Sequence, residues 1–441
     1  MIPQLNFMVV APVLADRIEA LKSLLESMTG NLGMANPKNQ ILPFGLFEEI
    51  HYSRFVVLDD RTLDDFAAFG KPVPAYPVAL AFIVDCDGSV EECISHLVRD
   101  AAAGLQQLFS HCEHFTAETD LLTWMTQRLQ PSSASYVNWV GRTVWQVREE
   151  AVLREFLLRS IDSAGIKAAP AQDIHKELAG RVRGALDAGT LVLTPPQTTP
   201  FAWQVHNGLH CLSLPLGILA VVILVCLFPW LLVPLALAAV FFMWLLRRYE
   251  KSEPEIIVRM PPQHSQMLAR LEDHDVTNQF TVLGSVKPTL FRSVTLTVIL
   301  WVVDYGARHI YNAGHLGRIQ TIHFARWAFL NKKERVLFLS NYDGSLEAYM
   351  DDFINKVGWG LNLVFSNGIG YPRTHWLVQD GSKSEQLFKY TLRRHQLPTE
   401  VWYKAYPGLT AFDLARNARI RKGIERKSLT EAEARLWLQD L

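Results

Sequence analysis

The chain has 441 residues, enough for two or three domains, and 49% of them are apolar while 20% are charged. Its 43 basic and 44 acidic side chains give a net charge of −1 and form no basic block, so we expect no nucleic-acid partner. The five cysteines include no C-x-x-C pair, which indicates reduced thiols in a cytoplasmic setting.

The N-terminal part predicts a strand–helix–strand–strand–helix–strand unit. Apolar residues recur at helical spacing in its helices, and β-branched and aromatic runs are typical of its strands. The predicted elements are strand Leu5–Ala11, helix Val13–Met28, strands Ile50–Leu58 and Val78–Asp85, helix Ser89–Ser110, and a strand near Cys112–Ala117.

An uncharged apolar stretch, Cys211–Leu246, follows. As one helix its 36 residues would be roughly 54 Å long, whereas the hydrocarbon core of a bilayer is about 30 Å thick. Pro229 and Pro234 favour a bent hairpin that crosses the membrane twice or dips into one leaflet. A buried helical hairpin in a soluble protein is the less favoured alternative, because an uncharged run this long is rare there.

Basic residues follow the stretch at once, at Arg247, Arg248 and Lys251. Positive charge favours the cytoplasmic side of a membrane. A hairpin returns the preceding segment to that side, so we expect both soluble parts of the protein on the cytoplasmic face.

Similar motifs occur on both sides of the apolar stretch. Ile50–Phe55 (IHYSRF) is repeated as Ile322–Trp327 (IHFARW), and Asp87-Gly88-Ser89 is repeated as Asp343-Gly344-Ser345. Fifteen residues after each serine comes a Gly-Leu pair, at Gly104 and Gly360. Such fixed offsets indicate an internal duplication.

The predicted fold is α+β: two ferredoxin-like repeats that form a pseudo-dimeric α+β barrel, interrupted by an α-helical membrane hairpin. An open sheet face needs a partner, and an identical repeat supplies one. The predicted domains are a first repeat with its extension (1–187), a linker (188–210), the hairpin (211–246), a second linker (247–277), a second repeat (278–425) and a C-terminal tail helix (426–441).

The first helix of the second repeat, Thr289–Ile310, contains the apolar run Val294–Val303. This run is too short to span a bilayer. It could lie along the bilayer surface with Arg292, Arg308 and Arg318 near the lipid headgroups, or pack on its own sheet.

Four polar residues of the second repeat are the candidate catalytic groups: His323, Arg326, Asp343 and His375. On a regular strand His323 and Arg326 point to opposite faces unless a bulge intervenes. The alternative is structural: the arginine pairs with a carboxylate, the histidine is a core residue, and the Asp-Gly-Ser turn caps a helix.

The run His111–His114 has metal-ligand residue types, but at most two of its side chains share a strand face, so we predict no metal site. Nucleotide-binding G-x-x-x-x-G-K-[ST] and G-x-G-x-x-G motifs, H-E-x-x-H and G-x-S-x-G do not occur. Their absence weighs against nucleotide hydrolysis, dinucleotide binding, zinc proteolysis and α/β-hydrolase chemistry.

The paired strands and Asp-Gly-Ser turns resemble, in plan, the dimeric α+β barrel superfamily, which includes dye-decolourising peroxidases and chlorite dismutase-like proteins. The resemblance implies haem in one repeat, with His323, His309, His315 and His375 as candidate ligands. The peroxidase motif G-x-x-D-G is matched by Ser340–Gly344, which lacks the first glycine. The chain is also similar to bacterial membrane-associated proteins with the same repeats, which implies the bacterial inner membrane.

Two hypotheses of different classes follow. In the first, the protein is a haem-dependent, peroxidase-like oxidoreductase that acts on a hydrophobic substrate at the membrane face. In the second, it is a non-catalytic scaffold, or a binding protein whose barrel holds a lipid or another apolar ligand. The lipid bilayer is a partner in both.

Overall fold

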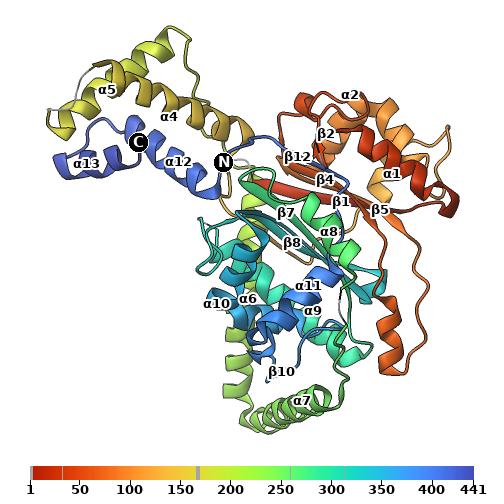
Figure 1. The fold of residues 1–441 in the computed structure, drawn as a ribbon. Helices are drawn as coiled ribbons and strands as arrows, with labels where there is room; N and C mark the ends of the chain where they lie inside the picture. Colours follow the sequence, from red (N-terminus) through yellow and green to blue (C-terminus); the bar gives the residue numbers. More distant parts are fainter. Residues whose placement is uncertain (1–2, 32, 165–168, 259, 313) are drawn as a thin grey trace.

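A computed structural model of the chain describes all 441 residues except 1–2, 32, 165–168, 259 and 313. It is an α+β protein in which two β-sheets lie face to face and a long helical hairpin projects from one side (Figure 1). We call residues 3–191 the first half and residues 277–441 the second half.

The first half begins with a strand and ends with two long helices. Its elements are β1 (Gln4–Pro12), α1 (Ile18–Ser27), β2 (Thr29–Asn31), β3 (Met34–Ala35), β4 (Ile50–Leu58), β5 (Ala79–Asp87), α2 (Val90–Phe109), α3 (Leu121–Gln127), β6 (Ala134–Val137), α4 (Val144–Ala164) and α5 (Ala171–Asp187).

The second half has a similar order of elements after a short helix, α8 (Pro262–Arg270). It contains β7 (Thr277–Ser285), α9 (Leu290–His309), β8 (Ile322–Leu330), β9 (Arg335–Asp343), α10 (Leu346–Phe365), β10 (Thr374–His375), β11 (Gln379–Asp380), α11 (Glu385–His395), β12 (Val401–Lys404), α12 (Ala411–Glu425) and α13 (Glu431–Gln439).

The Asp-Gly-Ser turns start a helix in each half. Gly88 and Gly344 have φ angles of +81° and +82°, which a residue with a Cβ adopts only at a cost. Ser89 then accepts a hydrogen bond from the Glu92 amide (3.1 Å), and Ser345 accepts one from the Ala348 amide (3.3 Å). The expected helix-capping role of these serines is confirmed.

Each half contributes one strand to the sheet of the other half. The first sheet has the order β1-β5-β4-β12-β3-β2, so β12 of the second half lies beside β4, with Val401 opposite Phe55. The second sheet has the order β6-β8-β9-β7, so β6 of the first half lies beside β8, with Ala134 opposite Trp327. Neither sheet is therefore complete without both halves.

The space between the two sheets is filled with side chains. Helices α1 and α2 cover the outer face of the first sheet, and α9 and α10 cover the outer face of the second. The inner faces meet in an aliphatic layer in which every side chain is at most 7% exposed. Its members are Met8, Val56, Leu58, Ala79, Ala81, Ile83, Leu283, Ala328, Leu330, Leu337, Leu339 and Leu397.

The predicted barrel is wrong, because the described strands form open sheets that do not close on each other. Irregular segments form hydrogen bonds with the free backbone groups of the edge strands β1 and β7. The Val10 amide donates to the Arg128 carbonyl (3.1 Å), and the Leu397 amide donates to the Thr281 carbonyl (2.9 Å). Because these loops cover β1 and β7, no further strand can join there and close the barrel.

Four helices form an arm that extends away from the sheets (Figure 1). Helix α4 packs on α12, and α5 packs on α13, around a separate apolar cluster that includes Leu153, Leu178 and Trp437. The arm joins the C-terminal extensions of the two halves, so it too depends on both.

The apolar stretch forms two helices, as predicted, but they are longer than Cys211–Leu246. Helix α6 is Phe201–Leu227, a short 3₁₀ turn follows at Pro229–Leu231, and α7 is Leu232–Ser252. The first ten residues of α6 belong to the segment that was expected to be a linker. At 1.5 Å per residue the two helices are about 40 Å and 32 Å long. Each is thus long enough to cross a hydrocarbon core.

A buried ionic cluster attaches the end of α7 to the second half. Glu253, just after α7, accepts hydrogen bonds from Lys287 (2.9 Å) and from Arg292 (2.8 and 2.6 Å). Arg292 is fully buried, so the alternative that places Arg292 near lipid headgroups is wrong for this residue. An uncompensated guanidinium in this place would be costly, and the carboxylate holds it in the protein interior.

Candidate functional site

Two buried arginines cross from one sheet to the other. Arg54 on β4 donates to the carbonyls of Phe280 (3.0 Å) and Ser340 (3.1 Å) in the second sheet. Arg326 on β8 donates to the carbonyls of Phe7 (3.0 Å) and Val84 (3.1 Å) in the first sheet. The two residues thus make reciprocal contacts, and each guanidinium satisfies backbone acceptors of the opposite sheet.

The charges around these arginines are unequal. Arg326 pairs with the Asp85 carboxylate, whereas Arg54 donates to the neutral Asn341 side chain. Asn341 in turn donates to Asp85 (3.3 Å), so one buried carboxylate serves two buried guanidiniums. Burial lowers the pKa of Arg54, and the Asp85 carboxylate partly opposes that shift.

Two histidine–aspartate pairs lie at one end of the inter-sheet space. His51 Nε2 lies 2.9 Å from Asp87 Oδ1, and His323 Nε2 lies 2.7 Å from Asp343 Oδ1. The other ring nitrogen of His51 is 3.0 Å from the Tyr406 hydroxyl. That of His323 has no hydrogen-bond partner among the described residues.

Each aspartate also caps a helix of the arm. The second carboxylate oxygen of Asp87 accepts from the Val144 amide at the start of α4 (2.9 Å), and that of Asp343 accepts from the Ala411 amide at the start of α12 (2.7 Å). A carboxylate is favourable at the positive end of a helix. The pairs therefore connect the strands that carry the histidines to the helices of the arm.

A β-bulge decides which way the candidate residues point. The register of β8 against β9 shifts between Ile322 and Phe324. As a result His323 contacts the Tyr52 ring of the other sheet, with ring centroids 5.6 Å apart, and Arg326 reaches across the same space. The regular alternation that would separate their faces does not hold here.

The structure brings only some of the predicted catalytic residues together. His323 and Asp343 are in contact, while Arg326 is bound to Asp85. His375 lies on β10 near the end of α7, where its ring is 3.2 Å from the Gln379 side chain. It is not part of the histidine–aspartate cluster.

The space between the two sheets has no room for haem. The aliphatic layer fills that space, and the cavity beside His51 and His323 has about 20 Å³, which holds about one water molecule. The other ligand candidates are also engaged: His309 is 2.8 Å from His210, and His315 is 3.0 Å from the Gly317 carbonyl. No step through a haem group can be assigned to these residues.

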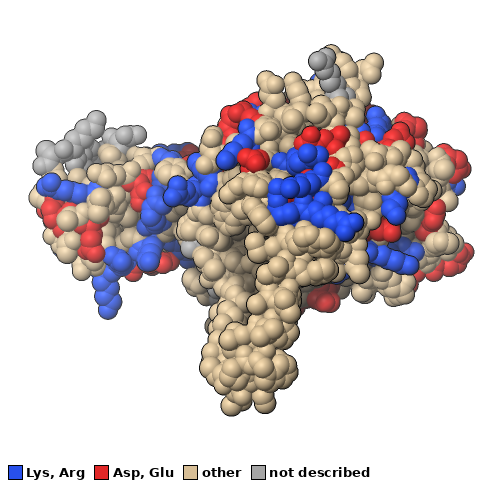
Figure 2. Space-filling model, turned by 90° about the horizontal axis from the view of Figure 1, so that it is seen from below, with Lys and Arg blue, Asp and Glu red and all other residues tan. Residues whose placement is uncertain are grey.

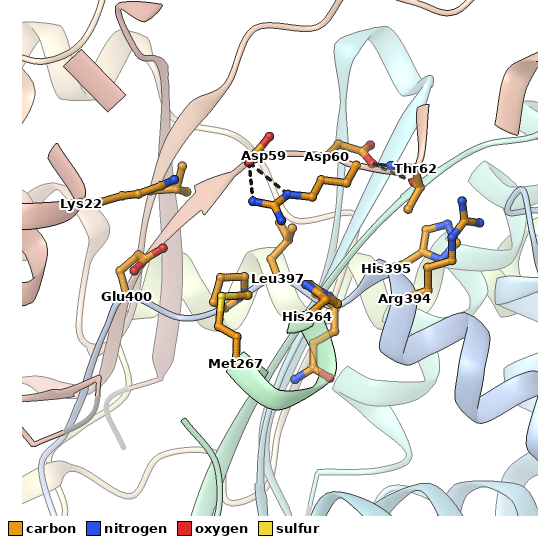
Figure 3. A pocket seen from close by; sticks show the side chains of 14 residues that line it. Lys22, Asp59, Asp60, Thr62, His264, Met267, Arg394, His395, Leu397 and Glu400 are labelled. Atoms are coloured by element: carbon orange, nitrogen blue, oxygen red, sulfur yellow. Dashed lines mark hydrogen bonds and ion pairs between the residues drawn. The ribbon is translucent and has the colours of Figure 1, made fainter. Parts of the chain in front are cut away.

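A pocket of about 170 Å³, with charged and apolar residues in its lining, lies where the two halves meet (Figure 3). Lys22 and Asp60 come from the first half, and Arg394 and Glu400 from the second, with His264 on α8 between them. Arg394 is held by Asp65 through two bonds of 2.5 and 2.9 Å. The sequence does not predict this pocket, because its residues are distant in the chain and belong to no motif.

No family model, curated protein or solved structure matches the chain. Function therefore has to be inferred from the geometry of this chain.

We predict that Asp85→Asn lowers the free energy of unfolding by about 3–5 kcal/mol. The substitution preserves shape but leaves two buried guanidiniums without a carboxylate. Chemical denaturation in detergent measures the loss. The control is Asp59→Asn, which removes an exposed pair with Arg61 and should change the stability by about 1 kcal/mol or less. Equal effects of the two substitutions would contradict a stabilising role for Asp85.

Glu150, in the second turn of α4, makes the stability of the protein depend on pH. It is buried, and Arg142 donates to it (3.0 Å). Burial raises its pKa from the ordinary 4.5 to about 7, against the opposing effect of Arg142 and Arg421. The folded state therefore retains a proton that the unfolded chain releases above pH 4.5.

The contribution of Glu150 to stability is full below pH 4.5 and is lost as the pH rises to about 7. We predict that Glu150→Gln, which cannot ionise, makes the stability fall less steeply across this window. Denaturation curves at several pH values measure the slope. The exposed Glu155→Gln variant is the control, and a slope unchanged in Glu150→Gln would refute the assignment.

Proposed function

We propose that this protein is a membrane-attached, non-catalytic scaffold. Its hairpin holds a rigid α+β body at the bilayer, and its helical arm extends from that body. The observation that carries the proposal is a contrast in apolar surface. Most apolar side chains of helices α6 and α7 are exposed, while side chains fill the space between the two sheets. In Figure 2 the protruding part of the molecule shows neither Lys or Arg nor Asp or Glu.

Exposed apolar surface on this scale has a physical consequence. In water it would favour aggregation, whereas in a bilayer it replaces lipid-to-lipid contacts at little cost. Of the described helices, α6, α7 and α9 are long and apolar enough to cross a membrane. Attachment through the hairpin is the arrangement that removes the largest patch from water.

The hairpin must enter and leave the bilayer on the same side. Segments on both sides of it build the same two sheets through β6 and β12, so the two halves cannot lie on opposite membrane faces. Arg247, Arg248 and Lys251 favour the cytoplasmic side, in keeping with the proposed bacterial inner membrane.

We also propose that the two halves are ferredoxin-like copies of one ancestral unit. Matched strand orders support this, β1-β5-β4 in one half and β7-β9-β8 in the other. Matched interactions support it further, since the arginines, the histidine–aspartate pairs and the helix caps recur at equivalent positions. Such a pair buries the open sheet faces without needing a ligand between them.

A scaffold should not carry haem. We predict that protein purified in mild detergent from haem-supplemented cells shows no Soret peak between 350 and 700 nm, because the inter-sheet space has no room for the macrocycle. A stoichiometric Soret peak that is lost on replacing His323 or His375 by Ala would instead favour the oxidoreductase hypothesis.

Attachment through the hairpin is tested by placing charge in it. We predict that the triple variant Leu219→Asp, Val222→Asp and Leu237→Asp moves from the alkaline-resistant membrane fraction to the soluble or aggregated fraction. Each charge costs about 2.5–3.5 kcal/mol at the centre of a bilayer. The matched control carries Ala at the same three exposed positions and should stay in the membrane. Retention of the Asp variant would contradict the proposal.

A further inference from the structure

Helix α9 has two apolar faces, and only one of them is used by the fold. The inner face, which includes Leu296 and Leu300, is buried on the second sheet. The outer face carries a stripe of large apolar residues at helical spacing: Leu290, Val294, Val298, Trp301 and Val302. They are exposed by 80%, 53%, 56%, 41% and 49% respectively. We call these five residues the α9 stripe.

The fold itself does not require an apolar outer face. Helix α1 occupies the corresponding place in the first half, between the first two long strands. Its outer face is polar, with Glu19, Ser23 and Glu26 exposed. The α9 stripe therefore has no counterpart on α1 of the first half.

The stripe is continuous with the hairpin at both of its ends. At the start of α9, Phe291 lies against Phe242 and Tyr249 of α7, with ring centroids 5.3 and 5.2 Å apart. At its other end, the Tyr305 hydroxyl donates to the Cys211 carbonyl of α6 (2.8 Å). The stripe thus lies between the bases of the two helices that expose the most apolar surface.

Helix α9 cannot cross the bilayer, although its length and composition would allow it. Its inner face is packed on the sheet, and Arg292 in its first turn is fixed inside the protein by Glu253. Only the outer face can meet lipid, so the helix must lie along the membrane surface. Trp301 is of the type that favours the interface between acyl chains and headgroups.

We infer that the α9 stripe is immersed in the bilayer as a third membrane element, with lipid acyl chains as its partner. This inference rests on the proposed membrane attachment through the hairpin. It adds an orientation: the second half lies against the bilayer, and the outer face of α1 stays in water. Contact at α6, α7 and α9 fixes the body against rotation, which a hairpin alone would permit.

The test uses variants that each have one exposed cysteine, labelled with an environment-sensitive NBD probe. The exposed Cys211 and Cys226 are replaced by Ser and Ala, while Cys86, Cys93 and Cys112 are buried and stay. Val298→Cys then reports on the α9 stripe, and Ser23→Cys on the outer face of α1 is the matched control. A third variant keeps Cys226 as the reference inside the hairpin. The full-length proteins are reconstituted in liposomes with doxyl-labelled acyl chains or with aqueous iodide.

The expected result is that the Val298→Cys label emits at shorter wavelength, loses most of its emission to the doxyl lipid and is protected from iodide. The Ser23→Cys label should show the reverse. Quenching of Val298→Cys by iodide but not by lipid would overturn the inference. Protection from both quenchers would also overturn it, because a second protein copy or another protein would then cover the stripe.

The reference variant separates this inference from the proposed function. If the label at Cys226 is quenched by the doxyl lipid while the label at Val298→Cys is not, the hairpin is inserted and only the role of α9 fails. If neither label is quenched by lipid, membrane attachment itself fails.

Discussion

Each sheet of this protein has one face covered by its own helices and a second face that only the other sheet can remove from water. This constraint determines most of the architecture. The aliphatic layer between the sheets supplies the apolar contact, and Arg54 and Arg326 supply a polar one by reaching the backbone carbonyls of the opposite sheet. Exchange of β6 and β12 adds continuous backbone hydrogen bonds between the halves. A guanidinium buried in such a layer is tolerable only because those acceptors and Asp85 are present.

The same constraint limits how the hairpin can sit in a membrane. Two halves that share their sheets must lie on one side, and the intervening helices have to return there. The buried cluster of Glu253, Lys287 and Arg292 then attaches the end of α7 to the second half, so movements of the hairpin and of the body are coupled. Since Lys287 and Arg292 belong to the second half, this cluster joins the hairpin to that half.

Residue types that resemble a catalytic centre are used here to hold elements together. A general base needs an accessible ring nitrogen and room for a substrate. His51 has both nitrogens engaged, by Asp87 and Tyr406, and His323 faces a cavity of about 20 Å³. The aspartates in turn cap the helices of the arm. The histidine–aspartate pairs therefore fix the arm relative to the strands. A fixed arm is what a rigid scaffold needs.

The sequence by itself determined the α+β class, the apolar helices, the capping serines and the motifs that recur on both sides of those helices. These follow from local composition, periodicity and spacing, which act over a few residues. Only the tertiary structure decided that the sheets stay open, that strands are exchanged, and that Arg292 is buried by Glu253 while the α9 stripe remains exposed. The bulge in β8, which turns His323 and Arg326 to one side, was likewise invisible in the sequence. All of these features depend on contacts between segments that are distant in the chain. A local sequence pattern does not specify which distant residue a side chain will contact.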